Sequence, residues 1–294
     1  MDEIYRITIR PTTFLITESQ RNQNPYIVPT TSFSKSELLK HHKELEKTLT
    51  NVHSYTIHPK EDLPDVVFTA NGGFSLMNLP ERVVILPSMK YPQRRHELKY
   101  LKDIYEKEGI KTIQFPLSEV FEGQAEAKWF HNGNLLICTY GYRSNRHTFT
   151  ILNQLLKKIY TSYGRSPPKL LVLPIESFDF YHTDVAMLEY DNTSCIVHKR
   201  AFSKRSLERL KETLGEKQVH VIDTPDSFCL NSIPDGDRLI THKVSEEVKH
   251  FLERATKKKV HMIDTSITEM SGGSVRCMVL DVYPPVRAPP TEKL

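Results

Sequence analysis

The sequence predicts an α/β fold, in which short strands and amphipathic helices alternate along the whole chain. Two observations support this: strand-like runs and helical stretches follow one another, and helix-then-strand units recur among hairpin signals. The pattern excludes an all-α bundle and an all-β sandwich. It leaves two arrangements open, an open α/β sheet and a circular array of small αβ modules. With 294 residues, the chain can bury a large core without disulfides or structural metals.

The first half of the chain begins with a strand. Residues 4–11 alternate in polarity and end in proline, as a strand does. Residues 34–52 predict a helix, with Ser34 as the N-cap candidate and Glu37 three residues later. The other elements expected here are strands at 65–70, 82–87, 111–116, 129–141 and 169–175, and helices at 94–109 and 147–164.

The second half repeats the pattern. Asp191-Asn192 predicts the turn of a hairpin over residues 185–200. Residues 202–223 predict a helix that ends at Gly215 and then a strand, and residues 245–264 predict another helix and strand. The last expected strand is at 274–284. Residues 283–294 are rich in proline and are expected to be an irregular tail. No linker or shift in composition marks a domain boundary.

Charge and cysteine content narrow the class of protein. The formal net charge of +4 is too small to predict nucleic-acid binding, and the mixed charges at 40–47 and 257–259 indicate solvated helix faces. No two of the four cysteines are close enough in sequence to form a zinc-ligand pair. The N-terminus lacks a signal peptide, and no apolar run is long enough to span a membrane. We therefore expect a soluble, cytoplasmic protein without a metal or a membrane partner.

Four polar or glycine-rich stretches beside predicted strands are candidates for chemistry. In the first, residues 64–74, the loop Asn71-Gly72-Gly73 could expose Asp65 and Asn71, although Asn-Gly is also a strong hairpin signal. In the second, residues 121–130, Glu122 precedes a glycine after a strand. A solvated loop glutamate is the alternative interpretation there.

The other two stretches supply a base and a nucleophile. His182 and Asp184 flank Thr183 at an expected strand start, so they would share one face, and such a pair suits acid–base work near neutral pH. A structural histidine is the alternative. Cys277 follows a Gly-Gly loop, where the backbone can approach a ligand closely. The remaining cysteines, for which we expect structural roles, are Cys138, Cys195 and Cys229.

Together these stretches indicate covalent catalysis on a cation. A cysteine with a histidine suits nucleophilic catalysis, and two neighbouring carboxylates suit a positively charged substrate. The sequence has no serine nucleophile elbow, phosphate loop or metal-ligand set that would compete with this interpretation. We expect no cofactor.

The order and content of the four stretches resemble the guanidino-group-modifying (pentein) superfamily. It includes arginine deiminases, dimethylarginine dimethylaminohydrolases, amidinotransferases and arginine dihydrolases. The resemblance extends from about Ile9 to about Val282. It implies one catalytic domain over residues 1–294, folded as a pseudo-fivefold, five-bladed α/β propeller of ββαβ modules.

The resemblance also implies roles for individual residues. Cys277 matches the nucleophile of the C-terminal glycine-rich loop, His182 the acid–base residue, and Glu122 the acidic residue of a Glu-Gly motif. The implied reaction is hydrolysis of the guanidino group of free arginine through a thiouronium intermediate. The residues that the resemblance assigns to substrate binding are Asp184, Asn71, Asp65, Asn24, Arg95 and Arg143.

Finer features favour an arginine dihydrolase, which would give ornithine, ammonia and carbon dioxide. The matching motifs are Thr69-Ala70-Asn71, the FEG motif from Phe121 to Ala127, and Asn24-Pro25. Dimethylarginine hydrolases carry Glu-Asp in place of Ala70-Asn71 and lack Asp184, and deiminases carry Asp in place of Asn71. The alternatives that stay open are dimethylarginine hydrolysis, arginine deimination, amidino transfer and a non-catalytic binding module. A homo-oligomer is also possible.

Overall fold

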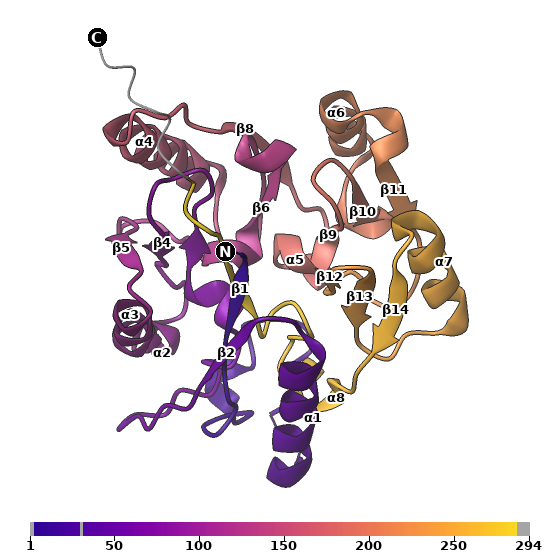
Figure 1. The fold of residues 1–294 in the computed structure, drawn as a ribbon. Helices are drawn as coiled ribbons and strands as arrows, with labels where there is room; N and C mark the ends of the chain where they lie inside the picture. Colours follow the sequence, from indigo (N-terminus) through magenta and orange to yellow (C-terminus); the bar gives the residue numbers. More distant parts are fainter. Residues whose placement is uncertain (1–2, 30–31, 287–294) are drawn as a thin grey trace.

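A computed structural model describes residues 3–29 and 32–286 of the chain. Its described strands form five three-stranded sheets that share one topology. In each sheet, two strands pair antiparallel, and a helical crossover then returns the chain to a parallel third strand. Figure 1 shows the long helices on the outside of the molecule and the first strands of the sheets nearer its middle. The predicted α/β class is confirmed.

The sheets follow one another along the chain, except that the last strand completes the first sheet. In the order of hydrogen bonding, the sheets are β15 (Leu280–Val282), β1 (Tyr5–Ile9) and β2 (Val52–Tyr55); β3 (Phe74–Ser75), β4 (Val83–Leu86) and β5 (Lys111–Gln114); β6 (Ala127–Phe130), β7 (Leu135–Tyr140) and β8 (Lys169–Pro174); β9 (Met187–Glu189), β10 (Cys195–His198) and β11 (Val219–Ile222); β12 (Ile233–Asp235), β13 (Arg238–Thr241) and β14 (Lys259–Met262).

Each crossover from the middle strand of a sheet to its third strand contains one long helix. These helices are α1 (Lys35–Thr48), α3 (Glu97–Lys107), α4 (Arg146–Ser162), α6 (Lys204–Leu214) and α7 (Glu246–Thr256). Serine caps begin three of them: the hydroxyls of Ser34, Ser203 and Ser245 each accept a backbone N–H from the first turn. The predicted helices are confirmed, with the one at 94–109 preceded by a separate short helix, α2 (Pro92–Arg95).

Apolar side chains fill the space between each helix and its sheet. In the third sheet, for example, Phe149, Leu152 and Leu156 of α4 pack with Trp129 and Leu136 of the strands in one buried cluster. The structural roles expected for Cys138 and Cys195 agree with this packing, because both thiols lie in such clusters and all four cysteines are free and buried.

Buried ion pairs connect the sheets to one another. Arg6 of β1 pairs with Asp235 of β12, in another sheet, at 2.8 Å, and also with Asp281 of β15, within its own sheet, at 3.3 Å. Lys128 of β6 pairs with Glu189 of β9 at 3.1 Å. A buried charge is costly without its partner, so these pairs favour one arrangement of the sheets over others.

Three predicted strands are wrong in part or in whole. Residues 129–141 are not one strand but an antiparallel hairpin of β6 and β7, joined by a turn over His131–Gly133. Residues 65–70 form buried turns rather than a strand and continue into a 3-10 turn over Thr69–Gly72. Of residues 274–284, only Leu280–Val282 are a strand. The sequence analysis also missed four short strands, β2, β3, β12 and β13. Of the predicted tail at 283–294, residues 283–286 have no regular structure, and residues 287–294 lie outside the described part of the chain.

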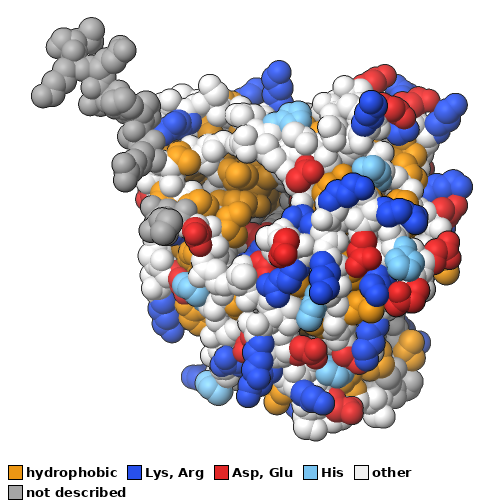
Figure 2. Space-filling model, turned by 45° about the vertical axis from the view of Figure 1, so that its right-hand side comes forward, with side chains coloured by type: hydrophobic (Ala, Val, Ile, Leu, Met, Phe, Trp, Pro, Cys, Tyr) orange, Lys and Arg blue, Asp and Glu red, His pale blue; other side chains and the backbone are white. Residues whose placement is uncertain are grey.

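The surface agrees with the charge analysis. Figure 2 shows Lys and Arg side chains interspersed with Asp and Glu over the face that it draws, without a large area of one sign. Among residues 3–29 and 32–286, no helix is long and apolar enough to cross a membrane.

Candidate active site

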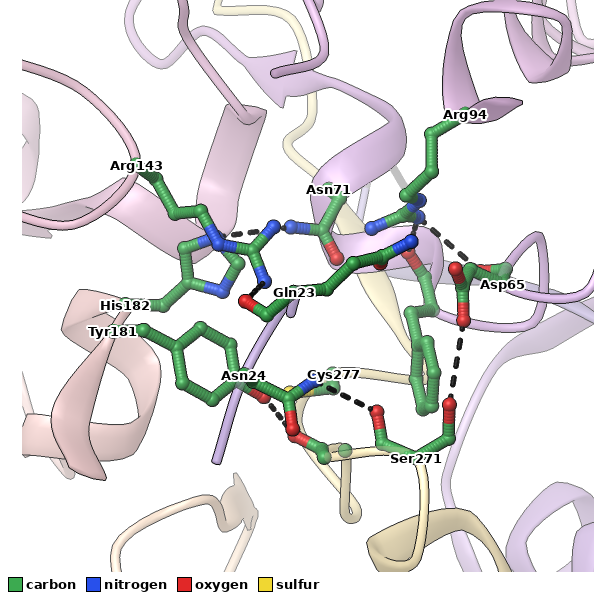
Figure 3. A pocket seen from close by; sticks show the side chains of 13 residues that line it. Gln23, Asn24, Asp65, Asn71, Arg94, Arg143, Tyr181, His182, Ser271 and Cys277 are labelled. Carbon is green, nitrogen blue, oxygen red and sulfur yellow. Dashed lines mark hydrogen bonds between the residues drawn. The ribbon is translucent and has the colours of Figure 1, made fainter. Parts of the chain in front are cut away.

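A small cavity brings together residues from distant parts of the chain (Figure 3). It offers about 20 Å³ to the centre of a water-sized sphere, which is room for one or two water molecules. Most of the side chains around it are polar or charged. The lining residues are Gln23, Asn24, Asp65, Phe68, Asn71, Arg94, Arg143, Tyr181, His182, Ser271, Gly272, Gly273 and Cys277.

The segment from Asp65 to Gly73 places Asp65 and Asn71 on the cavity wall. It is buried but has no strand partner, so its backbone groups are satisfied by local turns and by a contact with the loop that carries Cys277. In that contact, Ala70 N donates to Cys277 O at 3.0 Å. The buried loop explains why a β-like run of residues does not form a strand here.

Glycines allow the loops to approach one another closely. Gly123 has a φ of +64°, and a Cβ at this position would lie 2.4 Å from Gly73 O. A Cβ at Gly273 would lie 2.2 Å from the Phe68 ring. Side chains at these two positions would therefore push apart the loops that bear Glu122, Asn71 and Cys277.

Glu122 and His182 form a buried pair at the centre of the site. His182 Nε2 lies 2.8 Å from Glu122 Oε2, and Asn71 Nδ2 lies 3.4 Å from each of these two atoms. Burial alone would raise the pKa of Glu122, but Arg143 and the hydrogen bond with His182 hold that pKa well below its usual value. Burial lowers the pKa of His182, so the imidazole is neutral near pH 7.

Cys277 lies beside Asp184, on the other side of the site. The thiol donates to Asp184 Oδ2 at 3.5 Å. Burial, followed by the Asp184 carboxylate, raises the pKa of Cys277, so the sulfur carries its proton in the unliganded site. Asp184 itself does not line the cavity, and among the described residues its Oδ1 has no hydrogen-bond partner.

The local structure of the His-x-Asp motif differs from the prediction. His182 and Thr183 lie at the start of the short helix α5 (Thr183–Ala186), not at a strand start. His182 is the N-cap residue and faces the cavity, whereas the Thr183 hydroxyl points away from it and bonds to Thr139 Oγ1 at 2.7 Å.

Arg143 places its own guanidinium group in the site. Its Nη1 donates to Glu122 Oε2 at 2.9 Å and its Nη2 to Gln23 O at 2.9 Å. The rings of Tyr91 and Tyr181 each lie 4.9 Å from its central carbon, measured to the ring centroid. The cluster around Glu122 therefore already binds a planar, delocalised cation.

A second acidic group lies at the other end of the cavity. Asp65 is buried, and its Oδ1 accepts from Gln20 Nε2 at 2.7 Å and from Ser271 Oγ at 3.4 Å. Its Oδ2 has no hydrogen-bond partner within the described residues. Asn24 lies nearby and donates to Ser271 O at 3.1 Å. Burial raises the pKa of Asp65, in opposition to Arg94 and Gln20, so a ligand cation here would relieve an unpaired acid.

The structure places the predicted site residue Arg95 outside the cavity and its neighbour Arg94 on the cavity wall. Arg95 is exposed and donates to Met89 O and Lys90 O, away from the cavity. Its neighbour Arg94 is buried and lines the cavity, fixed by two bonds of 2.8 and 3.0 Å to Glu97. Both arginines lie on α2, where adjacent side chains point to different sides of the helix, and the sequence alone does not say which one faces inward.

The sequence analysis missed two further residues at the site. The Tyr181 hydroxyl donates to Gly272 O, and its ring covers Arg143. Asn231 contacts both the sulfur and the backbone of Cys277. Tyr181 could have been found from the sequence, because it directly precedes the His-x-Asp motif. Asn231 could not, because it lies 46 residues before Cys277 and in no motif.

The arrangement suits acid–base-assisted attack by sulfur on a cationic carbon centre. It contains a thiol, a neutral imidazole and several carboxylates, held in a cavity that admits little water. Among residues 3–29 and 32–286, no cluster of three His, Cys, Asp or Glu side chains is arranged to hold a metal ion.

Comparisons with known proteins point in the same direction. Residues 10–284 match the family described as N,N dimethylarginine dimethylhydrolase, eukaryotic. The chain is 27% identical over 237 residues, or 79% of its length, to the bifunctional arginine dihydrolase/ornithine cyclodeaminase AgrE of Nostoc sp., but spans only 31% of that protein. It is 25% identical over 230 residues, or 78% of its length, to the N(G),N(G)-dimethylarginine dimethylaminohydrolase of Mycobacterium tuberculosis, and spans 69% of it.

Solved structures show the same fold. The crystal structure of the substrate-bound N-terminal domain of ArgZ, a cyanobacterial arginine dihydrolase, superimposes with a TM-score of 0.82 at 22% sequence identity. The match covers 97% of this chain and 100% of that domain.

Proposed function

We propose a substrate and a reaction for this chain, which belongs to the dimethylarginine dimethylhydrolase family of the guanidino-group-modifying superfamily and is a hydrolase acting on guanidino C–N bonds. The substrate is free arginine, and the reaction is that of an arginine dihydrolase. The observation that carries this proposal is the Arg143 guanidinium held on Glu122, beside His182 and within the cavity that Cys277 lines.

The substrate guanidinium takes the place of the Arg143 guanidinium on Glu122. Such an exchange is required because the cavity admits only one or two water molecules while Arg143 remains in it. Charge-assisted hydrogen bonds from the substrate N–H groups then reach Glu122 and Asp184, and Asn71 holds one terminal nitrogen without adding another charge.

The other end of the substrate is a free amino acid. Asp65, with its unpartnered Oδ2, accepts the α-ammonium group, and Asn24 helps to orient it. Arg94 takes the α-carboxylate, joined by Arg143 once that side chain has left Glu122. An ammonium on Asp65 and a carboxylate on arginine are the charge pairs expected in a buried site.

Covalent chemistry follows from these contacts. The bound cation favours the thiolate of Cys277, whose proton passes to the neutral His182, and the sulfur attacks the guanidino carbon. His182 gives a proton to the departing nitrogen, which leaves as ammonia, and then takes a proton from the water that attacks the thiouronium carbon. The C–S bond breaks, and citrulline with a restored Cys277 remains. A second round on the neutral ureido group uses another water and gives ornithine, carbon dioxide and a second ammonia.

Variants of the reacting residues test this assignment. Purified Cys277→Ser, His182→Ala and Glu122→Gln proteins are incubated with arginine, and ammonia release is measured. We expect each variant to lose activity by at least about a hundredfold, the usual size of an acid–base contribution. Ammonia release that persists in the Cys277 variant would rule out the covalent mechanism.

Dimethylarginine hydrolysis is the second candidate, because the matching family is described by that substrate. Product analysis by chromatography and mass spectrometry separates the candidates when the protein is given arginine, citrulline or dimethylarginine. Ornithine from arginine supports the dihydrolase. Citrulline alone excludes it in favour of a deiminase, and dimethylamine released faster than ammonia supports the second candidate. No product from any substrate overturns the assignment of an enzyme.

We also infer that the five sheets are the blades of a pseudo-fivefold propeller and that the chain is one catalytic domain. The shared topology of the sheets and the closure of the first sheet by β15 support this inference.

A further inference from the structure

Asn231 is a fully buried residue that the reaction described above does not use. It lies just before β12, and its side-chain amide points at Cys277. Its Nδ2 donates to Cys277 Sγ at 3.1 Å and to Asp184 O at 3.0 Å. Its Oδ1 accepts from Cys277 N at 3.1 Å, and its backbone carbonyl accepts from Arg276 N at 3.2 Å.

We propose that Asn231 is a positioning residue that fixes the rotamer of Cys277 and stabilises its thiolate by donating an N–H to the sulfur. This inference deepens the proposed function and rests on it. One amide group binds both the backbone N–H and the sulfur of the same residue, so the side chain of Cys277 cannot rotate without losing a hydrogen bond. The sulfur is thus kept at one position before the substrate arrives.

The charges around the sulfur explain why such a donor is needed. The Asp184 carboxylate lies 3.5 Å from Sγ, and the Tyr181 hydroxyl and the His182 imidazole line the same cavity. Burial and the Asp184 carboxylate raise the pKa of Cys277, whereas the backbone N–H of Ser274 and the amide of Asn231 act to lower it. A hydrogen bond to an anion in a buried site is stronger than one to a neutral group, so it favours the thiolate over the thiol.

Asn231 also couples the nucleophile to the loop of the acid–base residue. Its bond to Asp184 O fixes the start of α5, whose N-cap is His182. The same amide nitrogen therefore holds the sulfur and the helix that bears the imidazole. The distance between nucleophile and proton donor depends on this one side chain.

The test measures the reactivity of Cys277 without any guanidino substrate. Purified wild-type protein and the Asn231→Asp, Asn231→Ala and Ser232→Ala variants are alkylated with iodoacetamide from pH 6.5 to 10, and the Cys277 peptide is quantified by mass spectrometry. Asn231→Asp keeps the acceptor for Cys277 N, removes the donors to the sulfur and to Asp184 O, and adds a negative charge beside the sulfur, whereas Asn231→Ala removes the whole amide without adding a charge. Ser232→Ala is the matched control, since Ser232 is the buried neighbour of Asn231 and its hydroxyl bonds to Cys229 O and Thr241 Oγ1 and, within the described residues, not to the sulfur.

Below the pKa of the Cys277 thiol, the rate of alkylation is proportional to the fraction of Cys277 that is ionised. We expect both Asn231 variants to react about tenfold more slowly than wild type, so that the curve of log rate against pH is displaced to higher pH by about one unit. The Ser232 variant should stay within about twofold of wild type, as expected for a site without contact to the sulfur. A residue that only held the fold would leave the position of the curve unchanged.

The proposal is overturned if the folded Asn231→Asp variant is alkylated at Cys277 as fast as wild type at every pH. It is also overturned if neither protein reacts. If Asn231→Ala does not fold, as judged by circular dichroism, Asn231→Asp alone decides. Because alkylation by iodoacetamide reports on the thiolate without turnover of a guanidino substrate, this result stands apart from the product analysis with arginine. If the curve shifts in the Asn231 variants but wild type releases no ammonia from arginine, Asn231 remains a hydrogen-bond donor to the thiolate and the proposed function is overturned instead.

Discussion

In the proposed reaction, the choice of product depends on Asn71. Its amide lies 3.4 Å from both Glu122 and His182 and adds no charge to a site that already contains several acids. A neutral ureido group needs hydrogen-bond donors more than further anions, and Asn71 supplies one.

Asn71→Asp should therefore shift the products of arginine from ornithine towards citrulline. We expect the ratio of ornithine to citrulline to fall about tenfold, the effect of one lost hydrogen bond, measured by chromatography at equal arginine consumption. Asn192→Asp in the β9–β10 hairpin is the control, because it makes the same substitution far from the cavity and should leave the ratio unchanged. An unchanged ratio in the Asn71 variant would mean that another group selects the product.

Arg94 and Arg95 are adjacent, and the structure assigns them different surroundings. Arg94→Lys keeps a positive charge beside Glu97 but loses the two-point geometry that fixes the guanidinium. We expect KM for arginine to rise about tenfold, as for one charge-assisted hydrogen bond. The constants for agmatine, a guanidine that lacks the carboxylate, should change little.

Arg95→Lys is the matched control and should leave both substrates unaffected, since Arg95 is exposed and lies outside the cavity. Steady-state kinetics of both variants with both substrates decide the point. Equal effects on arginine and agmatine would show that Arg94 supports the fold of the site and does not recognise the carboxylate.

The loop over residues 271–277 shows how one element depends on packing between loops. Gly273→Ala would place a methyl group 2.2 Å from the Phe68 ring, which itself lines the cavity. The strain should lower the free energy of unfolding by about 1–3 kcal/mol. Because the loop also carries Cys277, we expect kcat/KM to fall at least about tenfold.

Gly109→Ala separates the two effects. Gly109 has a φ of +67° and open space around it, so a methyl group there strains only the backbone, by about 1–2 kcal/mol. Thermal unfolding and kinetics are measured on both variants. We expect a similar loss of stability in each, with kcat/KM lowered only in the Gly273 variant. An equal kinetic loss in both would indicate that lower stability, and not the loop geometry, reduces activity.

Elements that obey a local pattern could be predicted from sequence, and the others could not. The helix after Ser34 has a cap and apolar spacing that act within a few residues, and it forms where expected. The buried turns over residues 65–70 have strand-like composition, but their shape is set by the Cys277 loop, which lies more than 200 residues away. The strands of two to four residues that were missed have too few positions to show an alternating pattern.

The same distinction applies to the site. Cys277, His182, Glu122, Asn71, Asp65, Asn24 and Arg143 could be placed together because short motifs mark them, and they all lie in or at the cavity. Arg94 and Asn231 have no such motif. Their roles depend on which face of a helix or loop turns inward, and tertiary packing decides that.

At the scale of the whole molecule, the chain closes on itself. β1 pairs in parallel with β2 and antiparallel with β15, so the first sheet contains both ends of the described chain. The buried bonds of Arg6 to Asp235 and Asp281 add contacts from β12 and β15 to the same strand. The first sheet is therefore complete only after the last strand has docked, and contacts of this sequence separation slow folding.

One buried cluster makes the stability of the molecule depend on pH. His242 follows β13 and lies between Asp226 and Glu269, with its Nε2 3.0 Å from Asp226 Oδ2 and its Nδ1 2.9 Å from Glu269 Oε1. Burial would lower the pKa of His242, but the two carboxylates outweigh it and raise the pKa to about 9. Glu269 lies at the end of α8 (Ser266–Glu269), directly before the loop that carries Cys277.

The sign of the effect follows from a folded-state pKa above the unfolded value of about 6.5. The stabilisation is complete below about pH 6.5 and is lost as the pH rises through about 9, where the folded protein gives up the proton. The shift from about 6.5 to about 9 corresponds to at most about 3.5 kcal/mol. Urea unfolding between pH 6 and 10 should show wild type losing this stability, while His242→Gln, which keeps the shape but cannot be charged, changes much less. Other titrating groups cancel in the difference between the two proteins, so parallel curves would exclude a charged His242 in the native state.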